Sequence, residues 1–229
     1  MSSFDKNQDR DQSPLSREKT KELLELVQNR AQEARRRGTV RAIVDELIVT
    51  LLLEAGLKAC ELCNINVEDA PASPENKELA IRGHGDTHPR TVQLNEDTQE
   101  TILRFVQVHR QNALPGDPLL VSERGNRFAY ASTYAKLKRL GRLCKIENLT
   151  PNRLRRTFIV NLFEQEQDLR LVQQHVGHAN IKTTAQYLRI SSPCQACGTA
   201  TSVQERIRID SGQILCKQCL ADLRGDGHS

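Results

Sequence analysis

The apolar residues between Val40 and Ala55 recur at spacings of three and four, the period of one face of an α-helix. The members of this pattern are Val40, Ile43, Val44, Leu47, Ile48, Leu51, Leu52 and Ala55. Gly56 follows directly, and glycine is suited to ending a helix because it adopts the left-handed conformation at little cost. We therefore expect a long helix here that forms the centre of the hydrophobic core.

Weaker signals predict further helices and one hairpin. Ser16, Asn95 and Thr150 are suitable N-caps, and proline at position 151 fits the first turn of a helix. The helices are expected over about 16–37, 58–63, 95–109, 131–144, 150–163, 168–176 and 180–189. Residues 79–82 and 90–94 are predicted to form a hairpin, and residues 119–122 a short strand. The predicted fold is mainly α with a small antiparallel sheet.

The composition is that of a globular protein, with 229 residues of which 38% are hydrophobic and 27% are charged. No apolar run reaches the roughly 18–20 residues that a membrane span requires. Residues 1–14 are polar, carry no apolar signal core and are predicted to be disordered. These features favour a cytoplasmic protein without a membrane partner.

Basic residues are concentrated between Lys136 and Arg156, where eight lysines and arginines face a single acid, Glu147. Such a cluster suits a phosphate backbone, although charge runs also form ordinary solvated helix faces. The predicted DNA-binding residues are Lys136, Lys138, Arg139, Arg142, Arg153 and Arg156.

The seven cysteines fall into two groups. Cys194 and Cys197 form one CxxC pair and Cys216 and Cys219 a second, with 18 residues between the pairs. This spacing predicts a zinc-ribbon-like module in which four thiolates hold a structural Zn²⁺ ion, the alternative being free cysteines without metal. Cys60 and Cys63 form a third CxxC in apolar helical surroundings, where core packing is the favoured interpretation.

Four segments carry a resemblance to a known family. They are residues 53–62 (LEAGLKACEL), 82–94 (RGHGDTHPRTVQL), 149–158 (LTPNRLRRTF) and 175–188 (HVGHANIKTTAQYL). In order and spacing they resemble the catalytic domain of tyrosine recombinases, the phage-integrase type, over about residues 16–190. The resemblance implies the fold of that domain, followed here by the small zinc-binding tail.

The resemblance also implies a chemistry. A tyrosine hydroxyl, here Tyr187, would attack a DNA phosphodiester and form a 3′-phosphotyrosyl link. Arg155 would bind a non-bridging phosphate oxygen, and His178 would hydrogen-bond the phosphate. No cofactor is implied for catalysis.

Three positions depart from the family pattern. Lys58 stands where the family has its first arginine, and Asn152 begins the family's His-x-x-Arg motif. The hairpin lysine that serves as general acid is absent, and His84 is nearest to it in the pattern, in a hairpin one residue longer than usual. Lysine lacks the planar fork of arginine, and asparagine does not transfer protons near neutral pH.

Two functions follow from this mixture of kept and changed residues. The first is site-specific DNA strand cleavage and rejoining, with impaired activity. The alternative is a catalytically inactive DNA-binding regulator, or an accessory subunit of a recombination complex. A protein-interaction module centred on the zinc ribbon is a third, weaker hypothesis.

The predicted organisation is a disordered N-terminus (1–14), a tyrosine-recombinase-like catalytic domain (15–190) and a zinc-ribbon-like module (191–229). Fewer than 20 residues precede the first helix, so we expect no separate helical domain to complete a DNA clamp. The expected partners are double-stranded DNA and other recombinase protomers or a partner recombinase, as on a mobile element. Binding should then be salt-sensitive and weakly sequence-selective.

Overall fold

The computed structural model describes residues 13–83 and 87–188, together with six short segments nearer the C-terminus. These segments are 192–193, 200–201, 207–208, 214–215, 219–220 and residue 223. The chain divides into two compact units, Met1–Ala179 and Asn180–Ser229. The segment predicted to be disordered lies almost wholly outside the described residues. The predicted limits of the catalytic domain and zinc module stay predictions.

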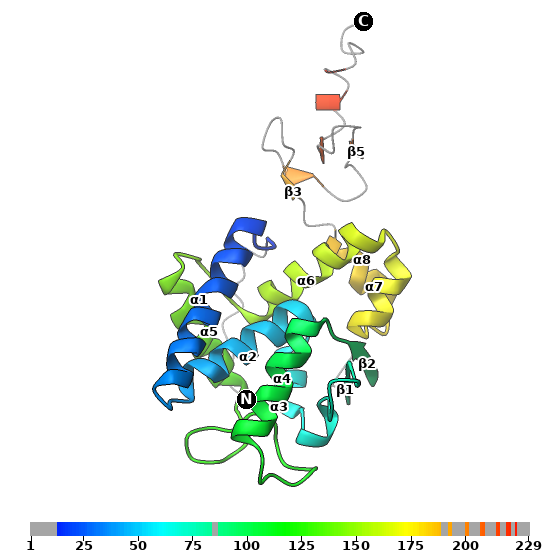
Figure 1. Ribbon diagram of the computed structural model, residues 1–229. Helices are drawn as coiled ribbons and strands as arrows, with labels where there is room; N and C mark the ends of the chain where they lie inside the picture. Colours follow the sequence, from blue (N-terminus) through cyan, green and yellow to red (C-terminus); the bar gives the residue numbers. More distant parts are fainter. Residues whose placement is uncertain are drawn as a thin grey trace, which may run out of the picture. The chain divides into compact units, whose positions relative to one another are not determined.

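Helix α2 (Arg41–Glu54) is the centre of the first unit, as the apolar pattern predicts (Figure 1). Every residue from 43 to 53 is buried, and α2 contacts five other helices: α1, α3, α4, α5 and α6. Gly56 follows the helix with φ of +61°, and a Cβ atom there would lie 2.2 Å from Cδ1 of Phe158. Only glycine fits this close approach between the end of α2 and helix α6.

The helices around α2 begin where the capping residues predict. The side chains of Ser16, Asn95 and Thr150 accept backbone N–H groups in the first turns of α1, α4 and α6. The helix bounds are α1 Arg17–Arg36, α3 Ala59–Asn64, the 3₁₀ turn η1 Val67–Asp69, α4 Glu96–His109, α5 Tyr130–Leu143, α6 Pro151–Glu166 and α7 Leu169–Val176. Helix α6 ends three residues later than predicted.

A two-stranded antiparallel sheet flanks the helices. Strand β1 (Glu78–Ile81) pairs with β2 (Arg90–Gln93), with Leu79 opposite Val92 and Ile81 opposite Arg90. The predicted hairpin is thereby confirmed. The strand predicted over 119–122 is wrong: within this segment only Val121 pairs, in an isolated bridge with Arg127.

The second unit contains α8 (Ile181–Leu188) and two short hairpins. The strands are β3 Ser192–Pro193, β4 Ala200–Thr201, β5 Ile207–Arg208 and β6 Ile214–Leu215. Strand β3 pairs with β4 and β5 pairs with β6, both antiparallel.

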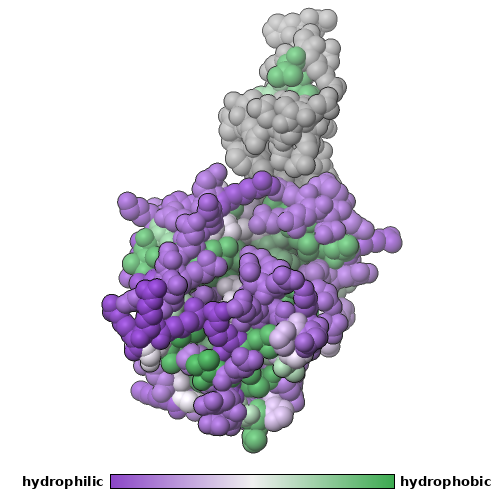
Figure 2. Space-filling model, in the orientation of Figure 1, coloured by the Kyte–Doolittle hydropathy of each residue, from purple (hydrophilic) through white to green (hydrophobic). Residues whose placement is uncertain are grey.

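On the face shown in Figure 2, hydrophilic residues predominate and hydrophobic ones form small, separate groups. None of the helices in the described part of the chain combines the length and the hydrophobicity of a membrane span.

Candidate active site

A buried carboxylate, Glu61 of α3, lies at the meeting point of three segments that are far apart in the sequence. Its side chain has no exposed surface. The guanidinium of Arg90 donates two parallel hydrogen bonds to it, from Nη1 to Oε1 at 2.7 Å and from Nη2 to Oε2 at 3.1 Å. The Lys58 backbone N–H donates to Oε2 at 2.8 Å, and Arg155 Nη1 lies 3.5 Å from the same oxygen. One acid thus links the start of α3, the hairpin and α6.

Electrostatics favour the charged form of this acid. Burial alone raises the pKa of the Glu61 carboxyl, but Arg90, the Lys58 N–H and Arg155 together outweigh burial. The pKa of Glu61 is therefore held below its ordinary value. The carboxylate is ionised at neutral pH and faces two guanidinium groups.

Arg155 of α6 is completely buried, and its guanidinium forms hydrogen bonds with groups from several segments. Its Nη1 donates to the Gly56 carbonyl at 2.6 Å, and its Nη2 donates to the Val176 carbonyl at 2.8 Å. Nη2 also lies 3.0 Å from Nε2 of His178. These contacts place Arg155 and His178, which are 23 positions apart, side by side.

The contact between Arg155 and His178 defines the protonation state of the imidazole. A guanidinium group has only donors, so Nε2 of His178 must accept the hydrogen bond. The ring is then neutral and carries its proton on Nδ1. A phosphate that received an N–H bond from Nε2 would therefore have to displace the Arg155 donor.

Backbone bonds fix His178 against the hairpin. Gly177, with φ of +70°, ends α7 and turns the chain, and His178 then pairs with Thr87 in an isolated bridge. The His88 N–H donates to the Gly177 carbonyl at 3.2 Å, and the Gln173 side chain donates to the His178 carbonyl at 2.9 Å. The hairpin and the end of α7 are thereby joined next to the cluster.

Comparison with known proteins decides the family. Residues 9–192 match the family described as "Phage integrase family", which is more than three quarters of the chain. This chain belongs to the phage integrase family, the tyrosine recombinases. The fold and the family that the sequence motifs predicted are both confirmed.

Individual relatives agree with this assignment. The chain is 34% identical to tyrosine recombinase XerC of Chromohalobacter salexigens over 155 residues, covering 67% of this chain and 50% of that protein. It is 30% identical to tyrosine recombinase XerA of Pyrococcus horikoshii over 151 residues, covering 65% of this chain and 51% of the relative. The chain thus spans about half the length of these relatives.

Solved structures show the same fold. A crystal structure of XerA recombinase superposes with a TM-score of 0.63 at 26% identity, covering 76% of this chain and 59% of that one. A XerH recombinase bound to its difH substrate gives a TM-score of 0.63 at 22% identity, over 76% of this chain and 49% of the other. The second likeness shows the fold alone.

Among the predicted site residues, the structure brings Lys58, Arg155 and His178 together. Lys58 stands immediately before α3, is half-buried and bonds Glu61 through its backbone, so it lies beside the Arg155 cluster. Asn152 is exposed in the first turn of α6. Tyr187 is the half-buried penultimate residue of α8, in the second unit. His84 and three of the four predicted zinc ligands, Cys194, Cys197 and Cys216, lie outside the described residues.

Sequence reasoning missed two members of the cluster, Glu61 and Arg90. Glu61 follows Lys58 by three residues in a short helix, and Leu62 and Cys63 beside it are buried. A charged residue inside an apolar helix is a signal that a buried partner exists, because an unpaired buried charge is costly. The identity of that partner was beyond the sequence, since Arg90 is 29 residues away.

The predicted DNA-binding residues divide into two classes. Lys136 and Arg139 both bind the buried carboxylate of Asp45 on α2, with Lys136 Nζ 2.7 Å from Oδ1. Lys138 and Arg142, on the same helix α5, have exposed side chains. The first two therefore fasten α5 to the core, while the second two face solvent.

The remaining two predicted DNA-binding residues lie on α6. Arg153 donates from Nε to the Ser13 carbonyl at 2.9 Å and from Nη1 to the Glu147 carbonyl. Arg156 is buried, with 8% of its surface exposed. The Arg153 side chain is thus hydrogen-bonded within the domain and the Arg156 side chain is buried in it. Their contact with DNA stays a prediction.

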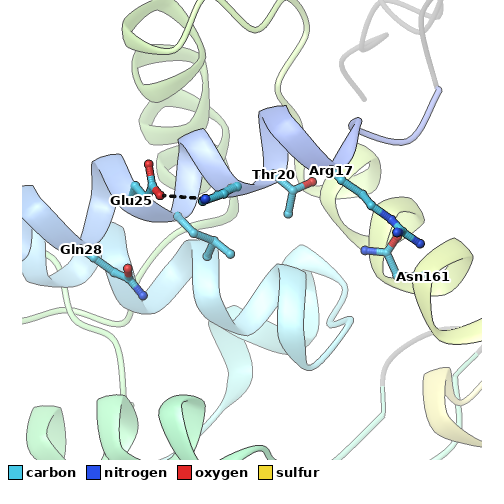
Figure 3. A pocket seen from close by; sticks show the side chains of 7 residues that line it. Arg17, Thr20, Glu25, Gln28 and Asn161 are labelled. Atoms are coloured by element: carbon cyan, nitrogen blue, oxygen red, sulfur yellow. Dashed lines mark ion pairs between the residues drawn. The ribbon is translucent and has the colours of Figure 1, made fainter. Parts of the chain in front are cut away.

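A cavity of about 350 Å³ lies between α1 and α6, away from the Glu61 cluster. Figure 3 shows Arg17, Thr20, Glu25 and Gln28 along α1, with Asn161 of α6 opposite Arg17. None of the residues that line the cavity is a predicted site residue. The cavity is therefore a separate feature of the first unit.

The buried carboxylate gives a stability prediction. Glu61→Gln keeps the shape of the side chain but leaves two buried guanidiniums facing a neutral group, so the free energy of unfolding at neutral pH should fall by about 3–5 kcal/mol. Because the pKa of folded Glu61 lies below 4.5, the contribution of its charge is complete above that pH and is lost as pH falls through the folded value. Urea unfolding over a pH series measures this.

The matched control is Glu100→Gln on α4, which breaks an exposed pair with Arg104. This change should cost only about 0–1 kcal/mol. A difference between wild type and Glu61→Gln that stayed constant from neutral pH down to about pH 3 would contradict the account.

Proposed function

We propose that this chain is the catalytic part of a site-specific tyrosine recombinase, which cleaves and rejoins double-stranded DNA together with other recombinase protomers. The observation that carries the proposal is the buried contact of 3.0 Å between Arg155 and His178. These are a phosphate-binding cation and a hydrogen-bonding imidazole at the positions that the family pattern assigns to them. Membership of the family and relatives named tyrosine recombinases support the same function.

In the proposed mechanism, the hydroxyl of Tyr187 attacks a DNA phosphodiester. The P–O5′ bond breaks, a 3′-phosphotyrosyl link forms, and the 5′ oxygen leaves with a proton. Arg155 and the neutral imidazole of His178 stabilise the charge that develops on the non-bridging oxygens, and Lys58 adds a second cationic group. Attack by a 5′-hydroxyl on the link reverses these bond changes and rejoins the strand.

The changed positions determine how fast this reaction is. Lys58 supplies charge without the fork of an arginine, so it holds one phosphate oxygen at a time. Asn152 can donate a hydrogen bond but carries no transferable proton near neutral pH. His84 is the proposed source of the leaving-group proton. Loss of one optimal donor typically costs about 10²–10³ in rate, so a slow enzyme is expected.

A nicked suicide DNA substrate tests the chemistry. The short piece of strand between the cleavage site and the nick diffuses away after cleavage, so rejoining is prevented and the phosphotyrosyl link is trapped. Wild type is expected to form a covalent adduct that Tyr187→Phe does not form, since the substitution removes only the hydroxyl. Denaturing gel electrophoresis of labelled DNA measures the adduct, and a gel-shift assay checks that the variant still binds DNA.

Failure to form an adduct while DNA binding persists would reject the catalytic function. It would favour the alternative of a DNA-binding regulator or accessory subunit. An adduct of equal yield in Tyr187→Phe would show that another residue is the nucleophile.

We propose that Lys138 and Arg142 contribute the phosphate contacts of α5, because their side chains are exposed and do not pair with Asp45.

Replacing both Lys138 and Arg142 by alanine should reduce the slope of log binding constant against log salt concentration by about 1.8, or 0.9 for each phosphate contact. Fluorescence anisotropy across a salt series measures this. The double change Lys77→Ala and Arg104→Ala, at exposed cations on other elements, is the control. An equal slope in both double variants would contradict the assignment.

We further propose that Cys194, Cys197, Cys216 and Cys219 hold one structural zinc ion. What supports this is the donor set of four thiolates and its setting in the chain, since β3 and β4 flank the first cysteine pair and β6 ends just before Cys216. Among the described residues no group of three metal-binding side chains occurs, and only Cys219 of the four belongs to them. Zinc would stabilise the small hairpins of the second unit.

Metal analysis of the purified protein tests the zinc proposal. We expect about one zinc per chain, lost in the double variant Cys194→Ser and Cys197→Ser because two of four ligands are removed. The variant Cys60→Ser and Cys63→Ser changes the other CxxC pair and should keep the metal. Protein produced with added zinc that contains none would reject the site.

A further inference from the structure

The side chain of Arg90 is almost buried, and its guanidinium contacts acceptors from two different helices. Only 7% of its side chain is exposed. Two nitrogens bind the Glu61 carboxylate, and Nε donates to the His175 carbonyl at 2.8 Å. All three nitrogens of this guanidinium therefore have protein acceptors, although the residue belongs to a hairpin strand and not to the helical core.

Arg90 and Arg155 donate hydrogen bonds to neighbouring backbone carbonyls at the end of α7. Arg90 binds the carbonyl of His175 and Arg155 that of Val176, the last two residues of α7. Both guanidiniums also face Glu61. The negative end of the α7 dipole and one carboxylate thus lie between two cations, which favours one fixed arrangement of all four groups.

The turn after α7 is shaped around Arg90. A Cβ atom on Gly177 would lie 2.9 Å from both Cδ and Nη1 of Arg90. His178 follows this glycine directly and is the residue that contacts Arg155. The position of the imidazole therefore depends on where the Arg90 side chain lies.

We propose that Arg90 is a positioning residue for the DNA-phosphate site. By bridging Glu61 and the end of α7, it sets the directions of Arg155 and His178 so that both meet at one phosphate. This inference rests on the proposed function, because it is that function which requires the two groups to converge. Arg90 acts through its neighbours, since its own donors are taken.

Arg90→Lys is the decisive variant, because lysine keeps the charge but cannot bind two carboxylate oxygens and a carbonyl in one plane. A misplacement of about 1 Å can cost about 10²-fold in rate, so adduct formation on the nicked substrate should slow by about that factor while DNA affinity stays unchanged. The control is Arg82→Lys, a half-exposed arginine of the same hairpin that pairs with Asp69. It should change neither quantity.

A spectroscopic measurement tests the same inference without turnover. Nitrogen-15 NMR of the imidazole in wild type should show His178 as the neutral ring with its proton on Nδ1, as the Arg155 contact requires. In Arg90→Lys this single form should be lost. If Arg90→Lys does not fold, the double variant Arg90→Gln with Glu61→Gln replaces it, because removing both charges leaves no unpaired charge between these two residues.

The outcomes separate the two proposals. Wild type that forms no adduct rejects the proposed catalysis, and the NMR comparison then decides on Arg90 alone. An unchanged His178 ring signal in Arg90→Lys overturns the positioning role, as does an adduct rate equal to wild type. A rate that falls only in proportion to the folded fraction of protein would also overturn it, since this would be a purely structural effect.

Discussion

The ion pair between Glu61 and Arg90 is the interaction on which the site depends. Neither group is stable in the interior alone, because an unpaired buried charge costs several kcal/mol. With Arg155 beside them they form a cluster in which one carboxylate faces two guanidiniums. The cluster joins α3, the hairpin and α6, three segments that are far apart in the sequence.

The carbonyl groups around this cluster fix the direction of Arg155, on which the proposed phosphate site relies. Arg155 donates to the ends of two helices, at Gly56 after α2 and at Val176 in α7. Its direction is therefore set before any ligand binds, which lowers the cost of orienting it during a reaction. The contact with His178 gives the site an internal acceptor that a phosphate oxygen can replace. In the proposed function, this preorganised cation would stabilise the charge that develops on the phosphate.

Sequence patterns predicted the helices and the hairpin because these depend on local signals. The apolar period of α2 and the caps at Ser16, Asn95 and Thr150 all correspond to helices in the structure. The motifs around Arg155 and His178 predicted the family and two members of the buried cluster. The patterns did not reveal that Asp45 holds Lys136 and Arg139, or that Arg90 binds Glu61, because such pairs join residues far apart in the chain. Charge counts alone do not distinguish cations that face solvent from cations that fasten helices.

A double-mutant cycle on Glu61 and Arg90 tests the central claim most directly. The free energy of unfolding is measured for wild type, Glu61→Gln, Arg90→Lys and the double variant. If the buried pair organises the site, the effects are strongly non-additive, with an interaction energy of about 1–3 kcal/mol. Effects that add to within about 0.5 kcal/mol would show that the two side chains act independently, and the account would be contradicted.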